Sequence, residues 1–570
     1  MDRKAILKAL EADPELEVLV IGAGINGAGV FRDLARQGLR VLLVDRGDFC
    51  SGASAASSHM AHGGIRYLEN GEFRLVAEAV AERNRLLVNA PHLVRPLPTI
   101  IPIFRFLSGL LNAPFKFLGL LDRPSERGAF VIKVGLILYD ALTRGRRVVP
   151  KHRFEGRKAS LARFPALNPS VAWTAAYYDG QLLSPERLNI EVILDGEAEG
   201  GHAMALNHCP VEGAGSGAGG RVEVRLRDLI GGRDLVLRPR AIVNAAGPWI
   251  DLVNSGLGLP SALIGGTKGS HLVLDNPALL AATGGCEFFF ENADGRIVLV
   301  QPWFDRVLVG TSDLPCEDYD RAICTEEEID YFVHLAARVF PDIPVRREDI
   351  VFTFSGVRPL PRSKAKNAGQ VSRDHSVGAG SLGAGEEAVQ VLSLVGGKWT
   401  TFRAFAEQVS DRVLAHLSRP RREGTAALPI GGGAAWPQGE AAASAFIEGL
   451  AREARVDEKR AGELFARYGT RASLVAARLA REGDERLVSA PDWSRSELSF
   501  LVEAEKALRL DDLLLRRTTV AWRGLATADL LAEAGVIMGG ILGWSGDDRE
   551  AEVLRVARLM TARHGAPSTV

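Results

Sequence analysis

Near the start of the chain stands Glu17-Val18-Leu19-Val20-Ile21-Gly22-Ala23-Gly24-Ile25-Asn26-Gly27, which joins the pattern of a short buried strand to a glycine-rich turn. Helical periodicity follows over residues 28–37, and a second apolar strand is predicted over residues 40–44. Strand, helix and strand at this spacing form a βαβ unit, the building block of a parallel sheet covered by helices. The stretch therefore predicts an α/β fold of the Rossmann type.

The three glycines of the turn have the positions of a dinucleotide fingerprint. Gly22 allows the tight turn, Gly24 lets a pyrophosphate approach the backbone, and Gly27 lets the helix pack closely on the strand. Asp45 ends the second strand, where its carboxylate can accept hydrogen bonds from a ribose. The alternative is a Rossmann-like turn that holds no nucleotide. The fingerprint favours a dinucleotide but does not distinguish NAD from FAD.

The segment after Asp45 helps to separate the two cofactors. Residues 50–67 are rich in serine, alanine and glycine. Small hydroxyl side chains and glycines let donors reach phosphates and the edge of a planar ring. We therefore favour a flavin, with an ordinary serine- and alanine-rich loop as the competing interpretation.

Further strand patterns come too late in the chain for one regularly alternating sheet. They are expected over residues 221–225, 235–244, 296–301, 307–310 and 389–394. This spacing indicates a second, more antiparallel domain threaded through the first. The glycine-rich stretches 213–220 and 377–385 are expected to be surface loops. From residue 440 onward helical periodicity dominates, which predicts a separate helical domain.

The composition argues against several classes of protein. The 570 residues are enough for about three domains. The 69 basic and 70 acidic side chains leave a net charge of −1, so charge gives no argument for nucleic-acid binding. Five scattered cysteines argue against a disulfide framework or a metal site and favour a reducing compartment. We recognise no secretion signal and no run of about 20 apolar residues that would span a membrane.

The chain contains several longer motifs, in order over roughly its first 400 residues: GAGINGAG (22–29), ASSHMAHGGIRYLENGEFRLV (56–76), IVNAAGPW (242–249), KGSHLVL (268–274), PWFDRVLVGTSD (302–313), SGVRPL (355–360), SRDH (372–375) and GGKWTTFR (396–403). Together they resemble the motifs of the FAD-dependent, quinone-linked glycerol-3-phosphate dehydrogenases. The helical tail is also similar to the C-terminal domain of that family.

This resemblance implies FAD as cofactor and three domains. We expect a Rossmann-type FAD-binding domain, interleaved with a mixed or antiparallel-sheet substrate domain and followed by an all-α C-terminal domain. The expected ranges are 15–90, 170–260 and 350–415 for the first, 91–169 and 261–349 for the second, and 430–570 for the third.

The resemblance implies oxidation of sn-glycerol 3-phosphate to dihydroxyacetone phosphate, with hydride transfer to flavin N5 and electrons passed to a membrane quinone. A secondary alcohol needs a base for its hydroxyl proton, and the family motif places His271 there. Arg358 and Arg373 match the family's phosphate-binding pair, a role that suits the forked donors of arginine. Arg66 and Tyr67 would close the other side of the pocket.

The motif GGKWTT would place a cation at the flavin. Reduction builds negative charge along the N1 and O2 edge, which Lys398 and the start of the next helix would stabilise. Lys398 is also expected to face the substrate and take part in catalysis. His62 is a second candidate base, or a residue that orients its loop. The expected cofactor contacts are Gly22, Gly24, Asn26, Gly27, Asp45, Ser57, Ser58, His62, Gly63, Gly64, Ala246, Gly247, Gly397, Lys398 and Thr400.

Three positions depart from the family pattern. His59 stands where many members have lysine, and Ala53 and Ala55 replace hydroxyl residues. These changes leave the pyrophosphate contacts open without affecting the choice of cofactor.

Residues 95–163 combine a strong basic excess with apolar bulk. They contain fourteen lysines and arginines against four acidic residues, and the part from 99 to 121 is rich in phenylalanine and leucine. Such a combination is typical of an interfacial anchor. We therefore expect a cytoplasmic protein bound peripherally to the inner face of the cell membrane. A buried helical hairpin is the alternative, and a homodimer stays open.

Other functions fit the same residues. An oxidase of the same fold would pass electrons to dioxygen, and an amine or amino-acid oxidase would use the two arginines for a carboxylate. A noncatalytic flavin-binding protein is a further alternative, against which His271, Arg358, Arg373 and Lys398 argue. Each of these side chains also has a structural interpretation, as a core histidine, a surface ion pair or a turn lysine.

Overall fold

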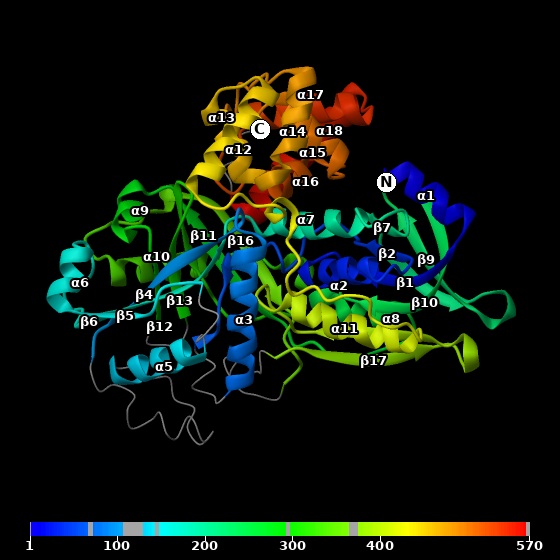
Figure 1. The fold of residues 1–570 in the computed structure, drawn as a ribbon, viewed down its shortest axis with the longest axis horizontal. Coiled ribbons are helices and arrows are strands. Elements are labelled where there is room, and N and C mark those ends of the chain that lie inside the picture. The colour runs from blue at the N-terminus through cyan, green and yellow to red at the C-terminus, as the bar shows by residue number, and fades with distance from the viewer. Residues whose placement is uncertain are drawn as a thin grey trace.

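The computed structural model describes residues 2–65, 72–105, 129–142, 148–291, 297–363 and 374–565. Two β-sheets form the two sides of the molecule, and a helical domain lies above the region where they meet (Figure 1). The predicted fold class is confirmed: a Rossmann-type domain is interleaved with a mixed-sheet domain and followed by an all-α domain.

The first sheet is built around the strand that precedes the glycine turn. Strand β1 (Glu15–Ile21) pairs in parallel with β10 (Arg233–Asn244) on one side and β2 (Val41–Val44) on the other. Eight strands join this sheet in the described residues, the others being β7 (Ala203–Leu206), β18 (Val389–Val395), β17 (Ser376–Leu382), β9 (Val222–Asp228) and β8 (Val211–Ser216). Burial of both faces explains why β1 and β2 are almost wholly apolar.

Helices cover this sheet and share its core. Apolar side chains of β1 and β2 pack with those of α2 (Ile25–Arg36), α7 (Pro185–Glu197) and α11 (Phe402–His416). Two shorter helices, α1 (Arg3–Ala12) and α8 (Ile250–Gly256), complete this part of the fold.

The second sheet is mainly antiparallel, as predicted. Its ten strands within the described ranges include, in spatial order, β15 (Leu314–Pro315), β11 (Thr267–Leu274), β14 (Arg306–Gly310), β13 (Ile297–Trp303), β12 (Glu287–Glu291), β4 (Val94–Ile103), β6 (Trp173–Leu182) and β3 (Met60–Ala61). Strand β16 (Ile350–Arg358) adds to β11, and β5 (Arg153–Gly156) adds to β6.

The two faces of the second sheet have different neighbours. One face packs against α9 (Pro277–Thr283) and α10 (Glu326–Val339). The other face includes Val273 and Phe354 and continues into the core of the helical domain. Three more helices, α3 (Phe73–Asn89), α5 (Ala129–Leu142) and α6 (Arg157–Arg163), contact the strands β4, β5 and β6.

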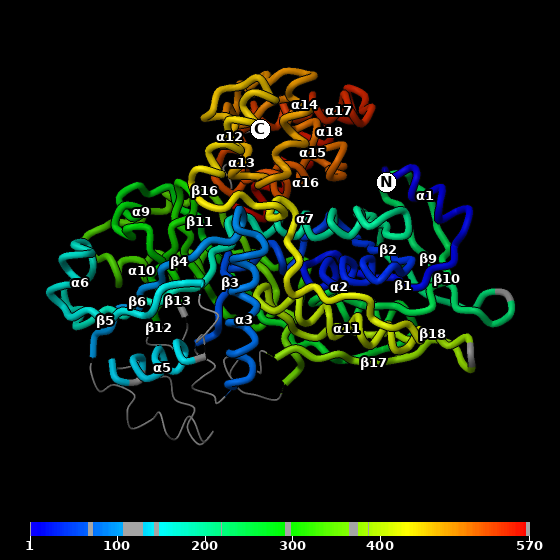
Figure 2. The backbone as a smooth tube through the Cα atoms, in the orientation of Figure 1, coloured from blue at the N-terminus to red at the C-terminus, as the bar shows by residue number. Residues whose placement is uncertain are grey.

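The predicted helical tail is confirmed. It contains α12 (Glu440–Ala454), α13 (Glu458–Tyr468), α14 (Ala472–Glu482), α15 (Arg495–Ala504), α16 (Leu510–Asp512), α17 (Ala528–Leu542) and α18 (Gly546–His564). Figure 2 shows the segment between α11 and α12 passing over the domain that contains the first sheet before it enters the helical domain. On this path Ile430 N donates to Asn89 O at 2.8 Å, which ties the segment to the end of α3.

The two glycine-rich stretches are not wholly loops, so that expectation was wrong. They contribute β8 and β17, which pair with β9 and β18 in antiparallel fashion. Each is an outer strand with mostly exposed or half-exposed residues. Backbone pairing with the inner strand holds such a strand in place, so glycine loses little packing there.

Strand pairing also differs from the expected domain ranges at three places. Residues 60–61, 173–182 and 350–358 fall in ranges expected for the FAD-binding domain, yet they form β3, β6 and β16 of the second sheet. Pairing between segments far apart in sequence decides this membership. With that adjustment we keep the three-domain division as a proposal.

Candidate functional site

The glycine turn after β1 has the geometry that the fingerprint requires. Gly22 has a φ of +100°, and a Cβ there would lie 2.6 Å from Ala245 O. A Cβ at Gly27 would lie 1.9 Å from Gly22 O. No larger residue fits either position unless the backbone moves, because β1, β10 and the start of α2 are in close backbone contact.

The N-terminus of α2 suits an anion. Gly24 is its N-cap and has no side chain that caps the helix. Ile25 N donates to Ser54 Oγ at 2.9 Å, so a hydroxyl of the following loop reaches the helix start. Because the other amides of the first turn and the helix dipole attract negative charge, this turn fits the pyrophosphate of FAD. The sequence analysis missed Ser54, although it lies in the hydroxyl-rich loop.

Asp45 lies at the end of β2, as predicted. Its Oδ2 accepts a hydrogen bond from Ala23 N at 2.7 Å, and its Oδ1 accepts one from Gly47 N at 2.9 Å. Burial raises the pKa of this carboxyl, while the two N–H donors act in the opposite direction. A carboxylate oxygen can accept more than one hydrogen bond, so capacity remains for a ribose hydroxyl. That contact stays a prediction.

The loop after Asp45 runs between the two sheets and contacts both sides. Gly63 N donates to Asp179 Oδ1 on β6 at 2.9 Å. Thr400 Oγ1, just before α11, donates to His62 O at 3.2 Å. The same loop contains the predicted contacts Ser57, Ser58 and Gly64. The structure therefore brings these residues together between the carboxyl end of the first sheet and the second sheet.

His271 lies at the centre of this arrangement. It is on β11, 1% exposed, and its ring stacks on Phe354 with centroids 4.7 Å apart and planes 5° from parallel. Its Nε2 lies 2.9 Å from Ser58 Oγ. Burial first, and then the charges of Arg358 and His59, hold the pKa of His271 well below its usual value. The imidazole is therefore neutral near pH 7, the state in which it can accept a proton.

Arg358 crosses β11 beside His271. A Cβ at Gly269, two residues before His271, would lie 2.3 Å from the guanidinium, so a larger residue there would displace the Arg358 side chain from this position. The guanidinium donates to Thr311 Oγ1 at 2.9 Å and to Asp313 Oδ1 at 3.1 Å. The structure thus places a paired cation next to the candidate base, and its binding to phosphate stays a proposal.

The turn before α11 meets the turn before α2. Asn26 Nδ2 donates to Gly396 O at 3.3 Å, and a Cβ at Gly397 would lie 2.3 Å from the Asn26 side chain. Lys398 follows Gly397 and is half-buried. Ala246 and Gly247 follow the end of β10, the strand between β1 and β18. Gly22, Asp45, Ala246 and Lys398 thus follow the carboxyl ends of β1, β2, β10 and β18, where open α/β sheets bind their ligands.

Some predicted residues lie outside the described residues. They are Arg66, Tyr67 and Arg373. Their roles remain predictions from the family motifs.

His59 has a role that the sequence analysis missed. Its ring is 1% exposed and lies 5.3 Å from Trp303 and 5.5 Å from Trp522, measured between centroids. Burial lowers the pKa of His59 to about 3, so the ring is neutral. Since Trp522 comes from the helical domain, His59 joins the cofactor loop to that domain. The only sequence signal was its departure from the family's lysine.

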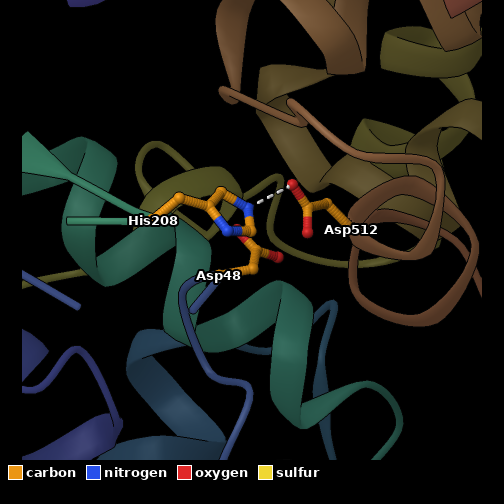
Figure 3. Close-up of side chains that lie close together, drawn as sticks. All are labelled: Asp48, His208 and Asp512. Carbon is orange, nitrogen blue, oxygen red and sulfur yellow. Dashed lines mark hydrogen bonds and ion pairs between the residues drawn. The ribbon is translucent and has the colours of Figure 1, made fainter. Parts of the chain in front are cut away.

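One cluster among the described residues has the composition of a metal site, namely Asp48, His208 and Asp512 (Figure 3). His208 Nε2 bonds Asp512 Oδ2 at 2.9 Å, but Arg516 and Arg517 reach Asp48 at 2.6 and 2.8 Å. A dication would lie beside these guanidinium groups. We therefore assign the cluster to an ion-pair network that attaches the helical domain to the end of β2.

Comparison with known proteins agrees with this geometry. Residues 17–403 match the family model described as FAD dependent oxidoreductase, and residues 424–549 match the C-terminal domain of alpha-glycerophosphate oxidase. A glycerol-3-phosphate dehydrogenase from Synechocystis sp. is 35% identical, covering 89% of each chain. A D-erythritol 1-phosphate dehydrogenase from Brucella abortus is 33% identical, covering 89% of this chain and 95% of that protein.

The fold agrees with a solved structure. The glycerol-3-phosphate dehydrogenase from Bacillus halodurans, complexed with FAD, has a TM-score of 0.76 and 22% identity, and the match covers 98% of this chain and 97% of that one. The predicted family and cofactor are confirmed. The chain therefore belongs to the FAD-dependent glycerol-3-phosphate dehydrogenase family of oxidoreductases and uses FAD.

Proposed function

We propose that the protein oxidises sn-glycerol 3-phosphate to dihydroxyacetone phosphate and passes the electrons to a membrane quinone. The observation that supports this most strongly is His271, a buried neutral imidazole bonded to the cofactor loop through Ser58 and placed beside Arg358. FAD, when bound, supplies N5 as the acceptor of the substrate hydride. The names of the relatives from Synechocystis sp. and Bacillus halodurans support the substrate.

His271 is the proposed base for the substrate hydroxyl. In the tautomer in which Nε2–H donates to Ser58 Oγ, Nδ1 keeps its lone pair. Nδ1 is buried and has no hydrogen-bond partner within the described part of the chain. It can therefore take the hydroxyl proton as the carbon loses its hydride.

The cations would bind and orient the substrate. A phosphate competes with Asp313 for the Arg358 guanidinium because it carries about −1.5 to −2 charges at pH 7. By the family motifs, Arg373, Arg66 and Tyr67 would complete the proposed phosphate pocket. Lys398 is proposed to face both the substrate and the flavin edge, where it would stabilise the charge that reduction creates.

Anaerobic mixing of the holoenzyme with glycerol 3-phosphate tests this function. Loss of the oxidised flavin absorbance is the expected result, and a flavin that stays oxidised contradicts the proposal. An oxidase is the second candidate, because the C-terminal region matches the domain of an oxidase family. Peroxide production in air, measured with and without a quinone analogue, separates the two: the dehydrogenase reduces the quinone analogue and forms little peroxide.

We also propose that α5 helps to dock the protein on a membrane. Among the described residues no helix has the length and apolar character needed to cross a bilayer. One side of α5 is buried in the core, through Ala129, Ile132, Leu136 and Tyr139. The side chains on its outer side are Phe130, Val134, Ile137 and Leu138, which are 42–51% exposed. An apolar helix face beside a basic segment favours an anionic lipid surface.

Of the expected anchor at 99–121, residues 99–103 form the end of β4 inside the second sheet, and residues 106–121 lie outside the described residues. The double variant Phe130→Ser with Ile137→Ser should lower co-sedimentation with anionic vesicles. Leu474→Ser, at an exposed leucine on α14, is the matched control. Equal binding of both variants would contradict docking through α5.

A further inference from the structure

Two buried polar side chains of the second sheet are not used by the mechanism above. Glu287 on β12 pairs in register with Thr99 on β4. The pairing of Phe288 with Val300 puts Glu287 and Gln301 opposite each other at the next position of β12 and β13. Glu287 and Gln301 are both 0% exposed. They are thus neighbours in the interior of the sheet.

Both side chains share a face of the sheet with His271. Gln301 lies opposite Leu308 on β14, and Leu308 lies opposite Val273 on β11. Opposed residues of paired strands point to the same face, and residues two apart on one strand do so as well. His271 precedes Val273 by two positions. Glu287 and Gln301 therefore project on the side of the sheet that carries the candidate base.

Their hydrogen-bonding groups are largely unused. Glu287 Oε2 accepts from Thr99 Oγ1 at 2.9 Å, but Glu287 Oε1 and both polar atoms of Gln301 have no partner in the described residues. Buried polar atoms without partners are rare in native proteins, so a ligand or ordered water is expected at such a place. Burial raises the pKa of Glu287 to about 8, so its carboxyl is protonated near pH 7 and offers a donor as well as acceptors.

The strand register also gives the position of the pair relative to Arg358 and His271. The Arg358 guanidinium crosses β11 at Gly269, two residues before His271. Gln301 is level with Val273, two residues after His271, and lies two strands away, at about 10 Å for a strand spacing of about 4.8 Å. A substrate with its phosphate at Arg358 and its reacting carbon at His271 would extend its far end toward the level of the sheet at which Gln301 and Glu287 lie.

We propose that Glu287 and Gln301 bind a hydroxyl group beyond the reacting carbon, so that the substrate class extends to polyol phosphates with four or more carbons. This inference rests on the proposed function. A hydroxyl both donates and accepts hydrogen bonds. The Gln301 amide and the protonated Glu287 carboxyl together offer an acceptor for its proton and a donor for its oxygen. Each added carbon carries another hydroxyl and brings the end of the chain closer to the pair.

The test compares the FAD-loaded enzyme and its variants on glycerol 3-phosphate and on a four-carbon polyol phosphate, with a quinone analogue as acceptor. The readout is the ratio of kcat/KM for the four-carbon substrate to that for glycerol 3-phosphate. We expect Gln301→Leu and Glu287→Ala to lower this ratio at least about tenfold, since a site loses much of its discrimination when a hydroxyl partner is removed. Glu287→Gln, which keeps a donor and an acceptor, should retain most of the ratio.

Thr283→Val is the matched control, because Thr283 is buried on α9 at the opposite face of the sheet. Its ratio should equal that of the wild type, and all variants should keep their FAD. An unchanged ratio in Gln301→Leu and Glu287→Ala, or loss of FAD from both, overturns the inference. Wild-type reduction by glycerol 3-phosphate but not by the longer substrate also overturns it and leaves the proposed function standing. If no polyol phosphate reduces the flavin, the proposed function itself fails.

Discussion

Replacing His271 by alanine should slow anaerobic reduction of the bound flavin by about 10²- to 10⁴-fold, the range that a positioned general base contributes. The structure favours a large effect, because the ring is 1% exposed and bulk water has no access to replace it. FAD should stay bound, since His271 contacts the cofactor loop through one hydrogen bond to Ser58. Substrate affinity should change little, because Arg358 and its partners remain.

The pH dependence adds a second readout. Burial, followed by Arg358 and His59, lowers the pKa of His271 well below 6.5. The neutral, proton-accepting form therefore dominates at pH 6.5, where an unperturbed histidine would be half protonated. At saturating substrate, protonation of His271 should not lower the wild-type reduction rate near pH 6.5, and should lower it only at more acidic pH.

Stopped-flow absorbance of the flavin at saturating glycerol 3-phosphate measures both effects. The second pKa of a phosphate is near 6, so a fall in rate that comes from protonation of the substrate persists in His271→Ala. A fall in rate that comes from protonation of the imidazole is lost in this variant. Undiminished reduction in the variant would refute the role as base. A fall in the wild-type rate near pH 6.5 that is absent in His271→Ala would refute the lowered pKa of His271.

Three other outcomes follow from the same contacts. Arg358→Ala should raise the KM for glycerol 3-phosphate by about 10- to 100-fold, because a charge-assisted hydrogen bond contributes about 1.5–3 kcal/mol. The flavin absorbance should stay normal, and loss of flavin would show that Arg358 contacts the cofactor instead of the substrate. Ser58→Ala removes the hydrogen bond that orients His271, which contributes about 1 kcal/mol, and should lower the reduction rate about fivefold. An unchanged rate would rule out a role of Ser58 in positioning His271. Asp48→Asn removes the buried carboxylate that Arg516 and Arg517 share, so Arg516 keeps Asp511 and Asp512, and Arg517 keeps the backbone carbonyl of Glu505. This change should lower the free energy of unfolding in urea by about 3–5 kcal/mol, whereas Asp234→Asn, in an exposed pair, should cost at most about 1 kcal/mol. Burial acts to raise the pKa of Asp48, but Arg517 and Arg516 outweigh it and lower that pKa, so this stabilisation is present above the ordinary aspartate pKa and is lost on acidification.

Much of the cofactor site was predictable because its determinants are local. The glycine turn, the acid at the end of β2 and the helical periodicity after residue 440 each depend on residues near one another in sequence. The motif order also led to His271, Arg358 and Lys398, which the structure places around the same loop. The geometry that makes His271 a neutral base was not predictable, since it depends on Phe354 and Ser58 from other segments.

The glycine-rich stretches show the opposite limit. Their composition is typical of loops, yet β8 and β17 form because a partner strand satisfies the backbone. Likewise, Glu287 and Gln301 carry no local signal of a shared site. They become neighbours only when β12 and β13 pair.

Short-range patterns were thus sufficient for the βαβ start, a dinucleotide cofactor and the helical C-terminal domain, because strand alternation, helix periodicity and turn chemistry act over a few residues. Long-range pairing was needed to make β6 and β16 part of the second sheet, to bury His271 and His59, and to align Arg358, His271 and Gln301 on one face. Those relations depend on which distant strands meet and in what register, a choice made by packing the whole chain.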